Sequence, residues 1–126
     1  MKIYIATKWE NKPYAREVRS QLEAMGHKVT SKWLDTGAND GPWPLAAKRD
    51  IADVQRAHIV CVLQDGYNLN EQGGCGMWVE MGIAIGLEMP VVIVTPTLTK
   101  RGVFHAAPGV TVVKQLTDFF TEELPI

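Results

Sequence analysis

Short apolar runs alternate along the chain with longer segments whose apolar residues recur every three or four positions. The runs predict five β-strands, at residues 2–7, 27–34, 58–63, 90–95 and 110–113. Most of them are almost continuously apolar, which is typical of a parallel sheet covered by helices on both faces. The 27–34 run alternates between apolar and polar residues, so we expect that strand nearer an edge of the sheet.

The segments between the runs predict helices. Residues 11–26 have apolar positions at helical spacing, with Asn11 as a candidate N-cap and Gly26 as a stop signal. Residues 45–57 and residues 77–88 are helical by the same pattern, and a terminal helix is expected after the last strand.

Alternation of strands and helices over the whole length predicts one α/β domain, residues 1–126. We expect a doubly wound, flavodoxin-like parallel sheet with strand order 2-1-3-4-5. In such folds ligands bind beyond the carboxyl ends of the strands, where the strand order reverses. Three segments are expected to converge there: the loop after Thr7, the loop after Leu34, and the polar loop 64–76.

Composition argues against several classes of partner. The net charge is −1 and the basic residues are scattered, which disfavours nucleic acid and anionic membrane surfaces. No segment is long enough to span a bilayer, and the N-terminal apolar run is too short for a signal peptide. Cys61 and Cys75 lack metal-ligand spacing, so we expect reduced thiols and a cytoplasmic location.

The stretch "GGCGMWVEMGIAIGLEM" (residues 73–89) leads from a glycine-rich run into an apolar helix that carries one early ionisable side chain, Glu80. A helix that is apolar all round is expected to be buried, and Gly82 and Gly86 would mark close approach of its backbone. A buried carboxylate is paired, protonated or next to a ligand, because desolvating its charge is costly. One interpretation is a first-turn glutamate held by backbone N–H groups. The glycine loop and the strand-end location favour a functional carboxylate instead.

A second carboxylate lies on the 45–57 helix. Asp50 shares a helix face with small and apolar residues such as Val54, so we expect it to point inward. Asp53 points with Arg49 and Arg56 and is predicted to belong to a solvated, charge-paired surface. Two carboxylates at one pocket suit glycosyl transfer or hydrolysis, in which one attacks the anomeric carbon and a second group handles the leaving group's proton.

Four tryptophans, Trp9, Trp33, Trp43 and Trp78, fall at or just after predicted strand ends. Core packing is the usual role of tryptophan. Four of them at one rim also fit a wall on which a flat base stacks. Trp9 and Trp78 are the preferred candidates for stacking.

In order and spacing, these segments resemble the nucleoside 2-deoxyribosyltransferase family, including the related deoxynucleoside 5′-monophosphate N-glycosidases. The resemblance rests on "KIYIAT", "LEAMGHKVTSKWL", "KRDIADVQRAHIVCVL", "GMWVEMGIAIGLEMPVVIV" and "GVFHAAPGV". It implies that Glu80 is the nucleophile, that Asp50 is the catalytic aspartate, and that Tyr4 orients the nucleophile through its hydroxyl.

The resemblance also implies a reaction in nucleotide salvage. Glu80 would attack C1′ of a 2′-deoxynucleoside, and the covalent deoxyribosyl-enzyme would react with a free nucleobase or with water. Neither a metal nor an organic cofactor is required, and the family implies a homo-oligomer, at least a dimer. The predicted substrate-binding residues are Thr7, Lys8, Trp9, Gly73, Gly74, Gly76 and Trp78, and the resemblance implies that the glycines present backbone N–H groups to the 5′ end of the sugar.

Two departures from the family pattern affect the expected chemistry. Gly74 and His58 stand where many members have aspartates, and Asp65 is a candidate replacement for the aspartate missing at Gly74. His58 is interpreted as a strand-end residue hydrogen-bonded to backbone. One alternative function is a deoxynucleoside 5′-monophosphate hydrolase, in which Lys8 and the glycine loop would hold the phosphate. The other is a non-catalytic nucleotide-binding module in which Glu80 is structural.

Overall fold

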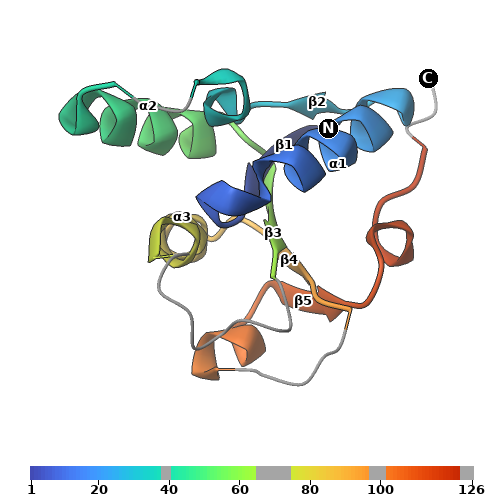
Figure 1. Cartoon of the computed structure of the whole chain (residues 1–126). Helices are drawn as coiled ribbons and strands as arrows, with labels where there is room; N and C mark the ends of the chain where they lie inside the picture. Colours follow the sequence, from blue (N-terminus) through green and yellow to red (C-terminus); the bar gives the residue numbers. More distant parts are fainter. Residues whose placement is uncertain (38–40, 65–74, 97–101, 123–126) are drawn as a thin grey trace.

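Five parallel strands form one sheet in the order β2-β1-β3-β4-β5 (Figure 1), which confirms the predicted α/β fold and strand order. The computed structural model describes residues 1–37, 41–64, 75–96 and 102–122. The strands are β1 (Lys2–Ala6), β2 (Lys28–Val29), β3 (Ile59–Leu63), β4 (Val91–Val94) and β5 (Val110–Val113).

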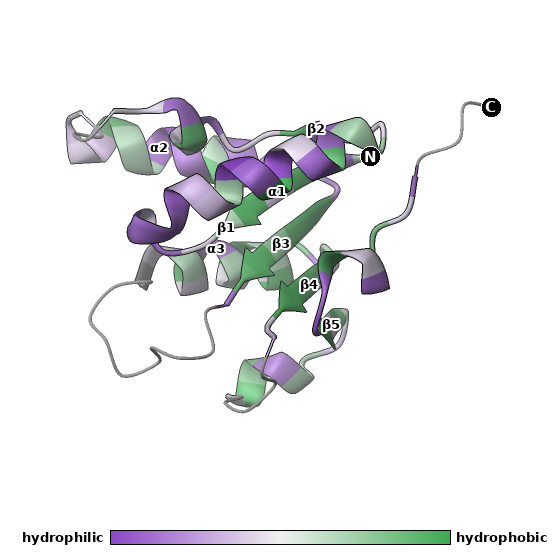
Figure 2. Ribbon diagram, turned by 45° about the vertical axis from the view of Figure 1, so that its right-hand side comes forward, coloured by the Kyte–Doolittle hydropathy of each residue, from purple (hydrophilic) through white to green (hydrophobic). Residues whose placement is uncertain are grey.

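Three α-helices connect the strands, namely α1 (Lys12–Ala24), α2 (Trp43–Gln55) and α3 (Cys75–Gly86). The crossover through α1 leads from β1 toward one edge of the sheet, and the crossovers through α2 and α3 lead toward the other. Because parallel crossovers are right-handed, α1 covers one face while α2 and α3 cover the opposite face. Figures 1 and 2 show this division. Within the described ranges, no helix is both long and apolar enough to cross a bilayer.

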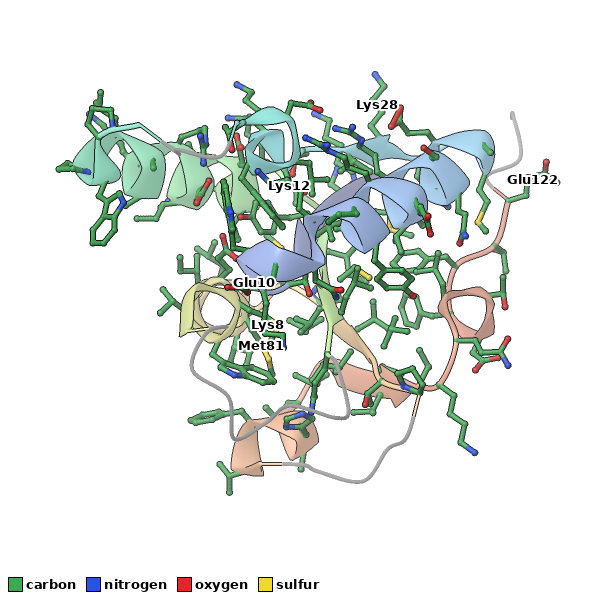
Figure 3. All side chains as sticks on the ribbon, in the orientation of Figure 1. Lys8, Glu10, Lys12, Lys28, Met81 and Glu122 are labelled. Carbon is green, nitrogen blue, oxygen red and sulfur yellow. The ribbon has the colours of Figure 1, made fainter. Side chains whose placement is uncertain are left out.

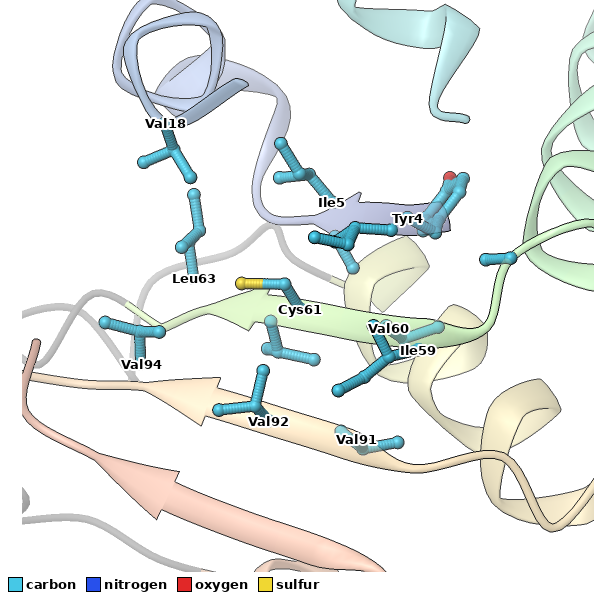
Figure 4. Close-up of a cluster of buried hydrophobic side chains, with 14 of the residues drawn as sticks. Tyr4, Ile5, Val18, Ile59, Val60, Cys61, Leu63, Val91, Val92 and Val94 are labelled. Atoms are coloured by element: carbon cyan, nitrogen blue, oxygen red, sulfur yellow. The ribbon is translucent and has the colours of Figure 1, made fainter. Parts of the chain in front are cut away.

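The core lies between the sheet and its helices. Every residue of β3 and β4 is buried, as the continuous apolar runs predicted, and the central strands are green in the hydropathy view of Figure 2. On α1, the buried positions Ala15, Val18 and Leu22 recur at helical spacing. Figure 4 shows Val18 pointing toward Leu63 at the end of β3.

The second predicted strand, residues 27–34, is mostly wrong. The strand β2 contains only Lys28 and Val29, and the chain then turns into a 3-10 helix, η2 (Lys32–Asp35). Side chains replace the missing ladder. Ser31 Oγ accepts a hydrogen bond from the Ile5 N–H at 2.7 Å, and Trp33 Nε1 donates to the Ile5 carbonyl at 3.0 Å. With the backbone of β1 satisfied in this way, a longer second strand is unnecessary.

Helix boundaries also differ from the prediction. The helix expected at 45–57 spans Trp43–Gln55, since Pro44 in its first turn needs no intrahelical N–H partner. The helix expected at 77–88 spans Cys75–Gly86. The terminal helix is a single 3-10 turn, η4 (Leu116–Asp118), in which the Asp118 carboxylate accepts from the Gln115 N–H at 3.1 Å. The stop at Gly26 is confirmed by its φ of 93°, a left-handed conformation that favours glycine.

Helix α3 is not buried all round, which corrects the expectation from its apolar sequence. Met81 and Ala84 face the core, whereas Val79 is 62% exposed and Leu87, just after the helix, is 51% exposed. A Cβ atom at Gly82 or Gly86 would meet nothing within 4 Å among the described residues, so neither glycine marks a close approach to those parts of the chain. The helix therefore presents an apolar surface to solvent.

Two histidines hold backbone groups, and His58 has the structural role predicted for it. His58 Nδ1 accepts from the Lys2 N–H at 2.9 Å, which ties the start of β3 to β1. His27 is buried, and its ring nitrogens contact the Met1 amino group at 3.0 Å and the Thr121 carbonyl at 2.8 Å. These contacts place both rings in backbone-holding positions.

Candidate active site

A hollow of about 190 Å³ opens at the carboxyl end of β1, where the predicted loops were expected to converge. Figure 3 shows Lys8 beside α3, which supplies one side of the hollow. The residues that line it are Thr7, Lys8, Trp9, Trp33, Asp50, Gly76, Met77 and Glu80.

Glu80 and Tyr4 form the polar centre of the site. Glu80 is half-buried on the second turn of α3 as the structure describes it, one turn beyond the position that a first-turn cap requires. Its Oε2 accepts a hydrogen bond from the hydroxyl of Tyr4, a fully buried side chain of β1. Tyr4 itself is not among the residues that line the hollow and contacts it through Glu80.

The surroundings keep the Tyr4 hydroxyl protonated. Burial raises its pKa far above the ordinary value near 10, and the charge of Glu80 and the hydrogen bond to it raise it further. Asp50 and Asp53 add smaller contributions to the same pKa shift. Tyr4 is therefore a neutral donor to Glu80 throughout the ordinary pH range.

Asp50 contributes the second carboxylate of the hollow, from α2. Its Oδ1 accepts from Arg49 Nη2 at 2.8 Å and from Arg49 Nε at 3.0 Å, and both side chains are less than a quarter exposed. The inward orientation predicted for Asp50 is confirmed. The guanidinium of Arg49 offsets one negative charge where two carboxylates share a hollow.

The prediction that Asp53 lies on a solvated surface is wrong. Asp53 is 0% exposed, and its Oδ2 accepts from the Lys32 N–H at 3.0 Å. Its pairing with Arg56 is confirmed, but Arg49 pairs with Asp50 instead. Because α2 packs against η2, the aspartate that the helical wheel turned outward is covered and holds the start of η2.

Two of the four tryptophans form an aromatic wall of the hollow. Trp9, in the 3-10 helix η1 (Trp9–Asn11), is 38% exposed, and Trp33 in η2 is 5% exposed. Their ring centroids lie 6.1 Å apart with planes tilted by 33°. Trp43 is 81% exposed at the start of α2, and Trp78 packs on His105 with centroids 5.6 Å apart. The described lining includes Trp9 but not Trp78, so the preference for Trp78 over Trp33 is not supported.

Other residues predicted to bind substrate lie in different situations. Thr7 lines the hollow, but its hydroxyl donates to the Leu63 carbonyl at 2.8 Å and accepts from Asn11 Nδ2 at 3.1 Å. Lys8 and Gly76 also line it, and a Cβ at Gly76 would meet nothing within 4 Å. The remaining predicted positions, Gly73, Gly74 and Asp65, lie outside the described residues.

The sequence interpretation missed Lys12, which lies behind the aromatic wall. Its Nζ is 3.4 Å from the centroid of the Trp9 ring and donates to the Thr36 carbonyl at 2.9 Å. The signal was present in the chain, because Lys12 lies three positions after Trp9 and side chains at that spacing meet on a helical turn.

Metal-ligating side chains do not gather anywhere in the described parts of the chain, where no group of three His, Cys, Asp or Glu residues could hold an ion. Cys61 is a free, buried thiol in β3, and burial raises its pKa to about 12. A thiol held protonated in this way is a poor nucleophile. The chemistry available to the hollow is therefore that of two carboxylates and a lysine in its lining, with the phenol of Tyr4 bonded to one of the carboxylates.

The fold is shared with several enzymes of known structure. A 2-deoxyribosyltransferase from Bacillus psychrosaccharolyticus aligns with 94% of this chain and 89% of its own, at 19% identity and a TM-score of 0.74. A CMP N-glycosidase of Clostridium botulinum aligns over 90% of this chain and 88% of its own, at 14% identity and a TM-score of 0.64. A 2-desoxiribosyltransferase from Leishmania mexicana aligns with 87% of this chain and 76% of its own, at 17% identity and a TM-score of 0.56.

A search among curated proteins found no significant sequence match. The model of the family described as nucleoside 2-deoxyribosyltransferase matches residues 3–114, a span that contains every described residue of the hollow and Tyr4, which bonds Glu80. The chain therefore belongs to the nucleoside 2-deoxyribosyltransferase family.

Proposed function

We propose that this protein cleaves the N-glycosidic bond of 2′-deoxynucleosides through a covalent deoxyribosyl-Glu80 intermediate and transfers the sugar to another nucleobase. The family and the shared fold support nucleoside deoxyribosyltransferase or N-glycosidase activity. The observation that carries the proposal is the buried Tyr4 hydroxyl donating to Glu80 in a hollow that Asp50 also lines.

The proposed reaction has two displacements at one carbon. A carboxylate oxygen of Glu80 forms a bond to C1′ while the bond from C1′ to the base nitrogen breaks, and its electron pair leaves with the base. Asp50 would donate a proton to the departing base. In the second step the nitrogen of an incoming base attacks C1′, its N–H proton returns to Asp50, and the Glu80 carboxylate leaves. Attack by water instead gives free deoxyribose.

Each neighbouring residue has a proposed part in these steps. Tyr4 orients the attacking oxygen through its hydrogen bond, and Asp50 positions Glu80 or shuttles the proton. Trp9 offers a ring face to the base at the rim of the hollow. Gly76 leaves its backbone accessible to the 5′ end of the sugar, a role also proposed for Gly73 and Gly74.

A deoxynucleoside 5′-monophosphate hydrolase is a second candidate, and one observation favours it. Lys8 lines the hollow and would place an ammonium where a 5′-phosphate could sit. Among the described lining residues, Lys8 is the single cation. One lysine is a modest phosphate site beside two carboxylates, so we favour the unphosphorylated substrate.

The assembly and the compartment of the protein are further proposals. The family resemblance predicts a homo-oligomer, at least a dimer, and the exposed apolar side chains on α2 and α3 are consistent with a second copy covering them. Trp43 and Leu45 on α2 are 81% and 65% exposed. A cytoplasmic location in nucleotide salvage stays a prediction.

The decisive experiment mixes the protein with each deoxynucleoside or its 5′-monophosphate, with and without a second free base. Chromatography then separates the products. A new nucleoside identifies a transferase, free base with sugar or sugar phosphate identifies a hydrolase, and unchanged mixtures refute catalysis and favour a binding module. Ribonucleosides in parallel test the requirement for an absent 2′-hydroxyl.

Two variants locate the chemistry. Glu80→Gln keeps the shape of the side chain and removes its nucleophile, so turnover is expected to fall by orders of magnitude. Glu88→Gln is the matched control, because Glu88 is exposed just beyond the end of the same helix. Mass spectrometry of wild-type protein mixed with a deoxynucleoside should detect a deoxyribosyl adduct on the peptide that contains Glu80. An adduct elsewhere would contradict the proposed nucleophile.

A further inference from the structure

The ammonium group of Lys12 is buried behind the aromatic wall formed by Trp9 and Trp33. Lys12 is 8% exposed, and its Nζ lies 3.4 Å from the Trp9 ring centroid and 5.7 Å from that of Trp33. The described lining of the hollow includes both indoles but not Lys12. A cation in such a position requires compensation for its lost hydration.

Thr36 and the indole rings contribute to this compensation. The Thr36 carbonyl accepts from Lys12 Nζ at 2.9 Å and the Thr36 hydroxyl lies 3.3 Å from it. The short distance to the Trp9 centroid places the ammonium over the face of that ring, where the negative quadrupole attracts it. Because Lys12 is the first residue of α1 and Thr36 follows the last residue of η2, these contacts connect the start of α1 to the end of η2.

The position of Lys12 decides how Trp9 meets a ligand. Trp9 lines the hollow and is 38% exposed, while Lys12 occupies one face of its ring. A flat ligand in the hollow therefore meets the part of the ring that the ammonium leaves open. The attraction between ammonium and ring depends on the cation lying over the ring centre, so it also restrains the rotation of the indole.

We propose that Lys12 is a positioning residue that acts through Trp9 and sets how tightly the hollow binds a nucleobase. This inference rests on the proposed function in one respect, namely that the base of the substrate stacks on Trp9. Stacking on a restrained indole loses less conformational entropy than stacking on a freely rotating one. Removing the ammonium should thus weaken binding of the base without changing the chemistry at Glu80.

The competing explanation is that Lys12 merely ties α1 to η2 through Thr36. Three substitutions separate the two explanations. Lys12→Gln removes the charge while its amide can still donate to the Thr36 carbonyl, and Lys12→Arg keeps the charge and the contact with the ring. Thr36→Val removes the contacts of the hydroxyl with the ammonium and with the Trp33 carbonyl, and it leaves the ammonium over Trp9.

The test is a double-mutant cycle on the binding of free adenine and free cytosine, measured by titration calorimetry. Free bases cannot turn over without a sugar, so wild-type protein serves directly. Lys12→Gln should raise the dissociation constant about three- to tenfold, whereas Lys12→Arg and Thr36→Val should change it less than about twofold. In a Trp9→Leu background, Lys12→Gln should have almost no effect, because the ring through which it acts is gone.

The outcomes separate this inference from the proposed function. The role of Lys12 would be overturned if Lys12→Gln weakened base binding equally in the wild-type and Trp9→Leu backgrounds. It would also be overturned if Thr36→Val weakened base binding as much as Lys12→Gln does, or if the wild-type protein bound neither base. If the binding constants show the expected coupling between Lys12 and Trp9 but the protein cleaves no deoxynucleoside, the proposed function is refuted and the role of Lys12 stands. In an active enzyme, Lys12→Gln should raise the KM for the acceptor base and leave kcat unchanged. If Lys12→Gln does not fold, Lys12→Met in both backgrounds provides the same comparison.

Discussion

The hydroxyl of Tyr4 on β1 donates a hydrogen bond to the carboxylate of Glu80 on α3, across 76 positions of sequence. Tyr4 is paired in register with Val60 of β3, so its backbone is held by the centre of the sheet. The donor is buried and the acceptor is half-buried at the edge of a hollow. A rigid strand thus fixes the direction of a carboxylate that a helix brings to a ligand-sized space.

Tyr4→Phe should reduce kcat/KM for deoxynucleoside cleavage about tenfold or more. A hydrogen bond to a charged group is worth about 1.5–3 kcal/mol, and its loss leaves Glu80 without the donor that orients it. Steady-state kinetics measures the change. Tyr14→Phe is the matched control, since Tyr14 is 45% exposed on α1 and its loss should leave the rate unaltered. Equal rates for wild type and Tyr4→Phe would remove Tyr4 from the mechanism.

The same residue predicts a dependence of stability on alkaline pH. Burial first, and Glu80 second, raise the pKa of Tyr4 in the folded protein above the value near 10 that it has when unfolded. Above pH 10 the unfolded chain therefore binds fewer protons than the folded protein, and the free energy of unfolding must fall as the pH rises. The contribution of Tyr4 is complete below that pH.

Urea denaturation between pH 8 and pH 11 checks the sign of this dependence. The free energy of unfolding of the wild type should decline above about pH 10, and Tyr4→Phe should decline less steeply over the same interval. Tyr14 also has a raised pKa, again chiefly through burial, so Tyr14→Phe belongs in the comparison. Parallel curves for wild type and Tyr4→Phe would show that Tyr4 is not the group responsible.

The central strands were predictable because each one is marked by the apolar residues of its own short segment. Nearly continuous apolar runs at β3 and β4 read as buried parallel strands, and the structure buries every one of their residues. The strand predicted at 27–34 was wrong because the side chains of Ser31 and Trp33, rather than a second strand, form the hydrogen bonds to the backbone N–H and carbonyl of Ile5. Such a substitution depends on tertiary contacts that a strand pattern does not contain.

The site was predictable to the extent that helix faces and strand ends determine it. The inward orientation of Asp50 was predicted correctly. Asp53 was predicted to face solvent because a helical wheel does not include other segments, such as η2, that cover the helix. The role of Trp33 as a wall of the hollow depends on the turn that replaced the expected strand. The link from Tyr4 to Glu80 came from family resemblance, and it joins elements that no local pattern relates.

The exposed apolar surface of α3 predicts self-association. Val79 and Leu87 are 62% and 51% exposed, although side chains of this kind are usually covered when they gather on one helix. We expect the protein to sediment as a dimer or larger species in analytical ultracentrifugation. Val79→Lys should shift that equilibrium toward the monomer, while Thr111→Lys on the exposed side of β5 should not. A wild-type monomer at concentrations well above those used for assays would contradict the prediction.

Asp50 and Asp53 lie three residues apart on α2 and should respond oppositely to the same substitution. Asp50→Asn should lower kcat about a hundredfold or more with little change in stability, because Asp50 lines the hollow. Asp53→Asn should cost about 1–3 kcal/mol of unfolding free energy, since it weakens a buried acceptor of the Lys32 N–H, and should spare catalysis in the folded fraction. Kinetics and urea denaturation on both variants provide the comparison. An inactive but fully stable Asp53→Asn protein would transfer the proton role to Asp53.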